Sequence, residues 1–149
     1  MGKTDRRELP AYSPAEAAHY LGIAASTIRY WAAGRPDAYA PVIQAAQSQP
    51  LVLSFSNLVE LHVLATMRRR FEVSMPKVRK AIQYVSRRFE ISRPLIAVQF
   101  ETNGIDLFVE RYGSLLNVSS AGQVEMRELL AASLRRVERD SHGVPIRLF

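Results

Sequence analysis

The sequence predicts a mainly α-helical protein with a small amount of β-structure, on the basis of three observations. Two pairs of helices with capping signals can be placed within residues 1–93. Beyond them the pattern changes to period two and contains Asn103-Gly104, a strong signal for a tight hairpin. A last amphipathic helix is predicted from about Gln123 to Glu138. We therefore expect residues 94–149 to form a small α+β segment, a hairpin plus a helix.

The first helix pair begins at "SPAEAAHYLG". Ser13 is placed to cap the helix, and Glu16, three residues later, completes a capping box. Gly22 follows the last apolar residue and predicts the end of the helix. A second short helix is predicted from about Ala25 to Ala33. Two short helices joined by about three residues around a glycine are typical of a helix-turn-helix.

The second helix pair follows a predicted hairpin. We expect residues 34–53 to form a loose hairpin with strands at "PVI" and "LVL" and its tip at "QAAQSQP". Ser54 is then placed to cap a long apolar helix. After a turn at "FEV", Ser74 caps a helix that runs to about Phe89. Residues 54–89 are thus predicted to be a second helix-turn-helix, which is rich in basic residues.

The predicted C-terminal hairpin has one unusual feature. Its apolar side chains alternate onto one face, but Phe108 falls on the other face with Asp106 and Glu110. A short strand is expected at "SLLNV", and the apolar "VPIRLF" is expected to be extended. Apolar side chains on such surfaces indicate either a partner or packing within the same domain. The residues that we expect at a partner interface are Phe108, Ile146, Leu148 and Phe149. The predicted inward residues of the last helix are Met126, Leu130, Ser133, Leu134 and Val137.

The charge of the chain is concentrated in one stretch. The net charge is +6, and residues 54–93 hold nine Lys and Arg against three Asp and Glu. The 53 residues before them carry +1 and the 56 after them carry −1. Concentrated positive charge is typical of a phosphate-binding surface, although a solvated helix face gives the same pattern.

The segment "STIRYW" predicts that the second helix has one buried side and one exposed side. At helical spacing, Ile28 and Trp31 lie on one side, whereas Arg29 and Tyr30 lie on the other. We expect the first two in the core and the second two facing outward. An outward Arg and Tyr fit contacts with bases and phosphates, and they also fit a surface arginine stacked on a tyrosine.

The order of these parts resembles the MerR-like winged helix-turn-helix DNA-binding domain. The resemblance covers roughly residues 12–89, and its best motif is Thr27-Ile28-Arg29-Tyr30 after a glycine-centred turn. It implies that Arg29 and Tyr30 contact DNA from the recognition helix, with Thr27 near phosphate. It also implies contacts with the DNA backbone from the second helix-turn-helix. The residues implied there are Arg68, Arg69, Arg70 and Lys77.

Nearly the whole chain is similar to a VapB-type antitoxin family, a domain of unknown function, in segments such as "TNGIDLFVE" and "GVPIRLF". That resemblance implies a cytoplasmic, dimeric DNA-binding antitoxin that represses its own operon and neutralises a PIN-type ribonuclease toxin. Neutralisation would use an extended segment, which we expect to lie beyond this sequence. The implied partners are double-stranded DNA, a second copy of the chain and the toxin. A MerR-like ligand-responsive regulator and a protein-interaction adaptor with an acidic partner stay open as alternatives.

Residue types that carry out catalysis are scattered along the chain. There are no cysteines, and the three histidines, His19, His62 and His142, are isolated from other metal-ligating residues. The glycines form no phosphate-binding loop. No apolar run reaches the ~20 residues needed to span a bilayer. We therefore expect no enzyme activity, no cofactor, no metal and no membrane partner.

Overall fold

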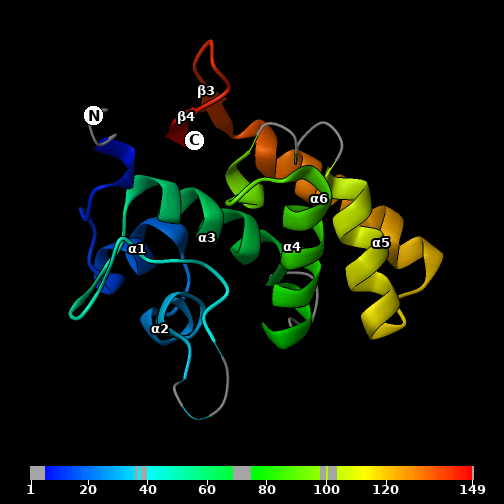
Figure 1. The fold of residues 1–149 in the computed structure, drawn as a ribbon, viewed down its shortest axis with the longest axis horizontal. Helices are drawn as coiled ribbons and strands as arrows, with labels where there is room; N and C mark the ends of the chain where they lie inside the picture. Colours follow the sequence, from blue (N-terminus) through cyan, green and yellow to red (C-terminus); the bar gives the residue numbers. More distant parts are fainter. Residues whose placement is uncertain are drawn as a thin grey trace. The chain divides into compact units, whose positions relative to one another are not determined.

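The computed structural model describes residues 6–35, 37, 40–68, 75–97, 100 and 104–148. It is mainly helical, with two small antiparallel sheets, as the sequence predicts (Figure 1). The chain divides into two compact units, residues 1–65 and residues 66–149. The division therefore falls earlier than the predicted boundary at residue 93, and we describe each unit by itself.

The N-terminal unit starts with the short 3-10 helix η1 (Arg6–Glu8), followed by α1 (Pro14–Leu21) and α2 (Ala25–Ala33). The predicted capping box of α1 is confirmed. The Glu16 backbone N–H donates to Ser13 Oγ, and the Ser13 N–H donates to Glu16 Oε1, both at 3.1 Å. Gly22 ends α1 with φ +67°, a left-handed conformation that glycine adopts without strain.

A small hairpin follows α2, but it is shorter than predicted. Strand β1 (Gln47–Ser48) pairs with β2 (Leu51–Val52), so β1 lies inside the stretch that we expected to be the tip. The expected first strand, at "PVI", is instead a loop segment in which Val42 and Ile43 are buried. Its Val42 N–H donates to the Trp31 carbonyl at 2.8 Å, which ties the loop to the end of α2 rather than to a strand partner.

Asn57 fixes this loop against the start of α3 (Phe55–Arg68). Its Oδ1 accepts the backbone N–H groups of Ala46 and Ser54, at 3.0 and 2.9 Å. Its Nδ2 donates to the Gln44 carbonyl at 2.8 Å and to Glu60 Oε1 at 3.1 Å. A buried amide that satisfies this many groups orders the chain around it, because each group would otherwise lose its hydrogen bond with water. Ser54 caps the helix as predicted, since its Oγ accepts the Asn57 N–H.

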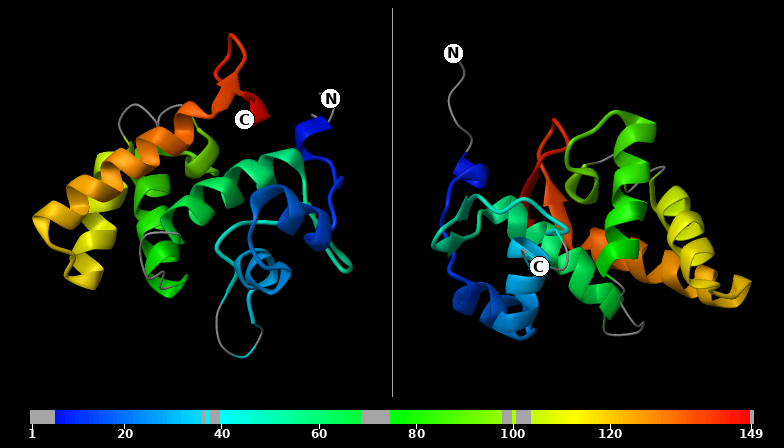
Figure 2. Two further views of the ribbon diagram at one scale, coloured as in Figure 1. Left: turned by 180° about the vertical axis from the view of Figure 1, so that it is seen from behind. Right: turned by 60° about the horizontal axis from the view of Figure 1, so that its bottom comes forward.

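The C-terminal unit is built on three helices, α4 (Met75–Phe89), α5 (Ile105–Leu116) and α6 (Ser120–Arg135). Helix α4 packs against α5, and α5 packs against α6 (Figure 2). The 3-10 helix η2 (Pro94–Ile96) also contacts α4. Val78, Ile82 and Val85, which recur at helical spacing, form the buried apolar face of α4. The predicted turn at 71–73 and the cap at Ser74 lie outside the described residues.

The hairpin predicted around Asn103-Gly104 is wrong, because the chain from Ile105 onward is helical. Gly104 has φ −80°, whereas a type I′ turn needs a positive φ there. Phe108 stacks on Tyr112 with ring centroids 5.7 Å apart, and Phe100 meets Phe108 edge-to-face at 5.8 Å. Phe108 and Tyr112 are four residues apart, the spacing that makes side chains neighbours on a helix. The packing of this aromatic cluster therefore overrides the local turn signal.

Two further details of this unit differ from the prediction. The strand expected at "SLLNV" is wrong, since α5 continues to Leu116 and ends at Asn117 in a left-handed conformation. The last helix ends at Arg135 rather than near Glu138, and Met126 and Leu130, which are predicted to face inward, are buried. The predicted inward residues Ser133 and Leu134 are also buried.

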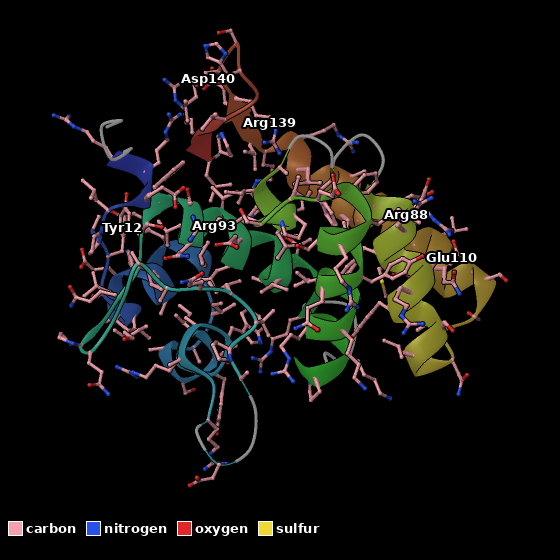
Figure 3. All side chains as sticks on the ribbon, viewed as in Figure 1. Tyr12, Arg88, Arg93, Glu110, Arg139 and Asp140 are labelled. Carbon is pink, nitrogen blue, oxygen red and sulfur yellow. The ribbon has the colours of Figure 1, made fainter. Side chains whose placement is uncertain are left out.

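A short sheet closes the unit. Strand β3 (Val137–Arg139) pairs antiparallel with β4 (Pro145–Leu148), so Val137 is buried on a strand rather than on the helix. The Arg139 guanidinium anchors the hairpin by donating to the carbonyls of Ile96 and Gly143, at 2.6 and 2.9 Å. Figure 3 labels Arg139 and Asp140 in this hairpin. The expected extended form of the "VPIRLF" segment is confirmed as far as Leu148.

Candidate nucleic-acid interface

Helix α2 has one buried side and one exposed side, as predicted. Ile28 is 0% exposed and Trp31 is 3% exposed, so the helix is fixed to its unit by two large apolar side chains. Arg29 and Tyr30 are both exposed. Ser26 is also exposed, and it lies three residues before Arg29 and four before Tyr30. These three side chains therefore share the outward face of the helix.

The outward face of α2 gains a second cation from the chain that follows. The Arg35 guanidinium carbon lies 5.9 Å from the centre of the Tyr30 ring, in a cation–π contact. Helix α2 itself contains no Asp or Glu. Arg29, Tyr30 and Arg35 therefore give this face hydrogen-bond donors and positive charge, the properties that contact phosphates and guanine edges. The sequence alone did not show Arg35 at this face, because its position depends on how the chain leaves the helix.

Thr27 is in a different environment from its two neighbours in the motif. Its side chain faces the buried side of α2, and the residue is only 7% exposed. Ala24 precedes the helix and supplies no side-chain cap to it. The burial of the Thr27 side chain gives no support to a phosphate contact by that side chain, and the proximity of Thr27 to phosphate stays a prediction, whereas Arg29 and Tyr30 face outward as predicted.

The cations predicted for the second helix pair lie at the end of α3 and on α4. Arg68 is exposed in the last turn of α3, and Lys77 is half-buried in the first turn of α4. Arg69 and Arg70 lie outside the described residues. Arg68 and Lys77 belong to the C-terminal unit, so they are described apart from α2.

Helix α4 has an unusual charge distribution. Its fifteen residues include five cations and no carboxylate. The cations are Lys77, Arg79, Lys80, Arg87 and Arg88. Arg87 and Arg88 lie in the last turn, where the helix dipole favours positive charge. Lys77 lies in the first turn, where the dipole opposes positive charge by about 0.3–1 kcal/mol, and Arg79 and Lys80 lie in the second turn, beyond most of this effect.

The residues predicted at a partner interface differ in accessibility. Phe108 is 0% exposed within its own unit, so the prediction that it lies on an exposed face is wrong. Its place in the aromatic cluster of α5 explains why it is apolar. Ile146 on β4 is 46% exposed, and Leu148 is half-buried. Phe149 lies outside the described residues.

We compared the chain with protein-family models, curated proteins and solved structures, and none of them matches it. Within the described residues, no helix combines the length and the apolar character needed to cross a membrane.

Proposed function

We propose that the chain is a sequence-specific double-stranded DNA-binding protein of the repressor type, which reads bases with the outward face of α2. The observation that carries this proposal is the division of α2 into two sides. Ile28 and Trp31 fix the helix, and Arg29 and Tyr30 project from it. A base-reading helix needs this arrangement, since its donors must reach the base edges without moving relative to the domain.

The donors on this face suit the major groove of DNA. The Arg29 guanidinium matches the O6 and N7 acceptors of guanine, and the Tyr30 hydroxyl can donate to phosphate. One such arginine contact gives about 1–3 kcal/mol of discrimination between bases. Specific binding exceeds non-specific binding by about 4–10 kcal/mol, so one copy of α2 is insufficient. We therefore propose a homodimer that reads two half-sites about one helical turn of DNA apart.

The proposed biological role is that of an antitoxin that represses its own operon and neutralises a PIN-type ribonuclease. The support for this role is the resemblance of the sequence to VapB-type antitoxins, together with the exposed Ile146 on the short β4 strand. A two-stranded sheet has open edges that another chain can extend. We place the toxin contact at this strand.

The experiment that tests DNA reading is a selection of duplexes from a random pool, followed by affinity measurements on the selected and a scrambled duplex. We expect Arg29→Ala to reduce the ratio of the two affinities by roughly 5- to 150-fold, as about 1–3 kcal/mol implies. Arg6→Ala is the matched control, since Arg6 is an exposed arginine of the same unit. Failure to enrich any sequence, or an equal effect of the two substitutions, would contradict the proposal.

The partner test is separate. Co-expression with the protein encoded beside this chain should yield a complex in which ribonuclease activity is inhibited, and Ile146→Asp should dissociate it. If no ribonuclease co-purifies and a small molecule raises the melting temperature of the isolated chain, the ligand-responsive regulator is the better interpretation.

A further inference from the structure

Four of the five cations of α4 occupy one side of the helix, and Arg79 lies outside this group. At 3.6 residues per turn, these four and Tyr84 fall within an arc of about 100°. That arc points away from the buried Val78, Ile82 and Val85. We call this group, together with Arg111 of α5, the cationic stripe. Its members are Lys77, Lys80, Tyr84, Arg87, Arg88 and Arg111.

Arg111 joins the stripe from the neighbouring helix. Its guanidinium carbon lies 5.7 Å from the centre of the Tyr84 ring, which is in the middle of the arc on α4. The packing of α4 against α5 therefore brings a fifth cation to the surface that α4 presents. Lys80, Arg87, Arg88 and Arg111 are exposed, and Lys77 is half-buried. Figure 3 labels Arg88 toward the end of α4.

A solvated helix in the same unit has a different composition. Helix α6 carries Glu125, Arg127, Glu128 and Arg135, so its charges are mixed in sign. Arg127 forms an ion pair with Asp106 of α5 at 3.0 Å. Helix α4 has no carboxylate of its own to balance its cations, and it places Lys77 in the first turn, where the helix dipole opposes it. Solvation alone does not account for a helix whose five charged side chains all have the same sign.

The dimensions of the stripe fit a nucleic-acid backbone. Eleven residues separate Lys77 from Arg88, which is about 16 Å along a helix. A DNA strand advances 3.4 Å along the axis per phosphate, so the stripe extends beside roughly five phosphate steps. Protein interfaces are depleted in lysine and are centred on buried aromatic anchors. The one aromatic ring of the stripe is covered by Arg111, which favours a phosphate backbone over an acidic protein.

We propose that the cationic stripe is a sequence-independent binding site for the phosphate backbone of duplex DNA, located in a different unit from α2. The choice of DNA as the polyanion rests on the proposed function, and the existence of the site rests on the stripe itself. Lysine and arginine act here as point charges, so the site holds any duplex sequence equally.

The test is the salt dependence of binding of the full chain to a random-sequence 20-base-pair duplex, measured by fluorescence anisotropy. Five phosphate contacts give a slope of log K against log salt near −4.5, to which other cations add. We expect Arg87→Ala/Arg88→Ala to flatten the slope by about 1.8 and to weaken binding roughly 10- to 60-fold at 0.1 M salt. Arg87→Lys/Arg88→Lys should retain most of the binding, because it keeps both charges.

The matched control is Arg135→Ala/Arg136→Ala, which removes two adjacent exposed arginines from the end of α6 in the same unit. It should leave the slope within about 0.5 of the wild-type value. Equal effects of the two double substitutions would overturn the proposal. Competition by poly-L-glutamate as strong as that by the duplex would overturn it in favour of an acidic protein partner.

The outcomes also separate this site from the proposed reading face. Random-duplex binding that depends on Arg87 and Arg88, with no preferred sequence, would support the stripe and contradict the reading function. Sequence-selective binding that is insensitive to Arg87 and Arg88 would do the reverse. A chain that binds no duplex at all would contradict both.

Discussion

Helices α2 and α4 differ in the number of charged side chains that they expose. Helix α2 is short, carries one cation of its own and is held by Ile28 and Trp31. Helix α4 is longer and carries five cations without a carboxylate. A few donors on a fixed helix suit discrimination between bases, whereas a row of point charges suits the regular charge of a DNA backbone. Under the proposed function, DNA affinity and base specificity would therefore come from different units of this chain.

The two surfaces should also respond differently to salt. A bidentate arginine contact with a base depends on geometry and is short-ranged. Contacts between cations and phosphates release counterions, so their contribution falls steeply as salt increases. High salt should therefore remove the contribution of α4 before that of α2.

The largest expected effect comes from the aromatic cluster that supports α5 and Arg111. Phe108→Ala removes a fully buried ring that contacts Phe100 and Tyr112. We expect it to lower the free energy of unfolding by about 3–5 kcal/mol, as cavity formation in a core does. Urea denaturation measures this loss. Leu107→Ala, at the half-buried neighbouring position, should have a smaller effect; equal effects would place Phe108 outside the core.

The next largest effect on stability distinguishes the buried side of α2 from its exposed side. Ile28→Ala should lower the free energy of unfolding by about 2–5 kcal/mol, because Ile28 is fully buried. Arg29→Ala, at the adjacent exposed position, should change it by less than about 0.5 kcal/mol. Thermal and urea unfolding of both variants check this. A loss of stability in Arg29→Ala as large as that in Ile28→Ala would show that Arg29 is structural.

The smallest expected effect on stability comes from removing the N-terminal cap of α1, the helix that supports α2. Ser13→Ala removes the cap of α1 and should cost about 1 kcal/mol of stability. Ser119→Ala, which removes the corresponding cap of α6, should cost a similar amount in the other unit. Only Ser13→Ala should also reduce sequence selection, through fraying of α1 beside α2. Equal loss of selection in both variants would rule out a local effect of the α1 cap on the reading face.

Elements with strong local signals could be predicted from the sequence. The capping box joins Ser13 and Glu16, three positions apart, and Gly22 ends α1 by donating to the Ala18 carbonyl four positions earlier, so both patterns are visible in the chain. The orientations of Ile28 and Arg29 follow from helical periodicity for the same reason. The cationic character of α4 was also visible as a concentration of Lys and Arg.

The C-terminal unit was harder to predict because two periodicities overlap in it. Apolar residues around Asn103-Gly104 alternate as in a hairpin, but Ile105, Phe108 and Tyr112 also recur at helical spacing. Packing among Phe100, Phe108 and Tyr112 decides between the two, and packing between distant residues leaves no local signal. The contact of Arg111 with Tyr84 was unpredictable for the same reason, since it depends on the docking of α5 on α4.

The most direct test of whether base recognition and backbone binding use separate surfaces is to measure both properties in Arg29→Ala and in Arg87→Ala/Arg88→Ala. Each variant is titrated with the selected and with the random duplex over a series of salt concentrations. We predict that Arg29→Ala reduces the ratio of the two affinities roughly 5- to 150-fold while its salt slope changes by no more than about 0.9. We predict that Arg87→Ala/Arg88→Ala flattens the slope by about 1.8 on both duplexes and preserves the ratio between them. Loss of the ratio and of the slope together in either variant would contradict the assignment of the two tasks to separate surfaces.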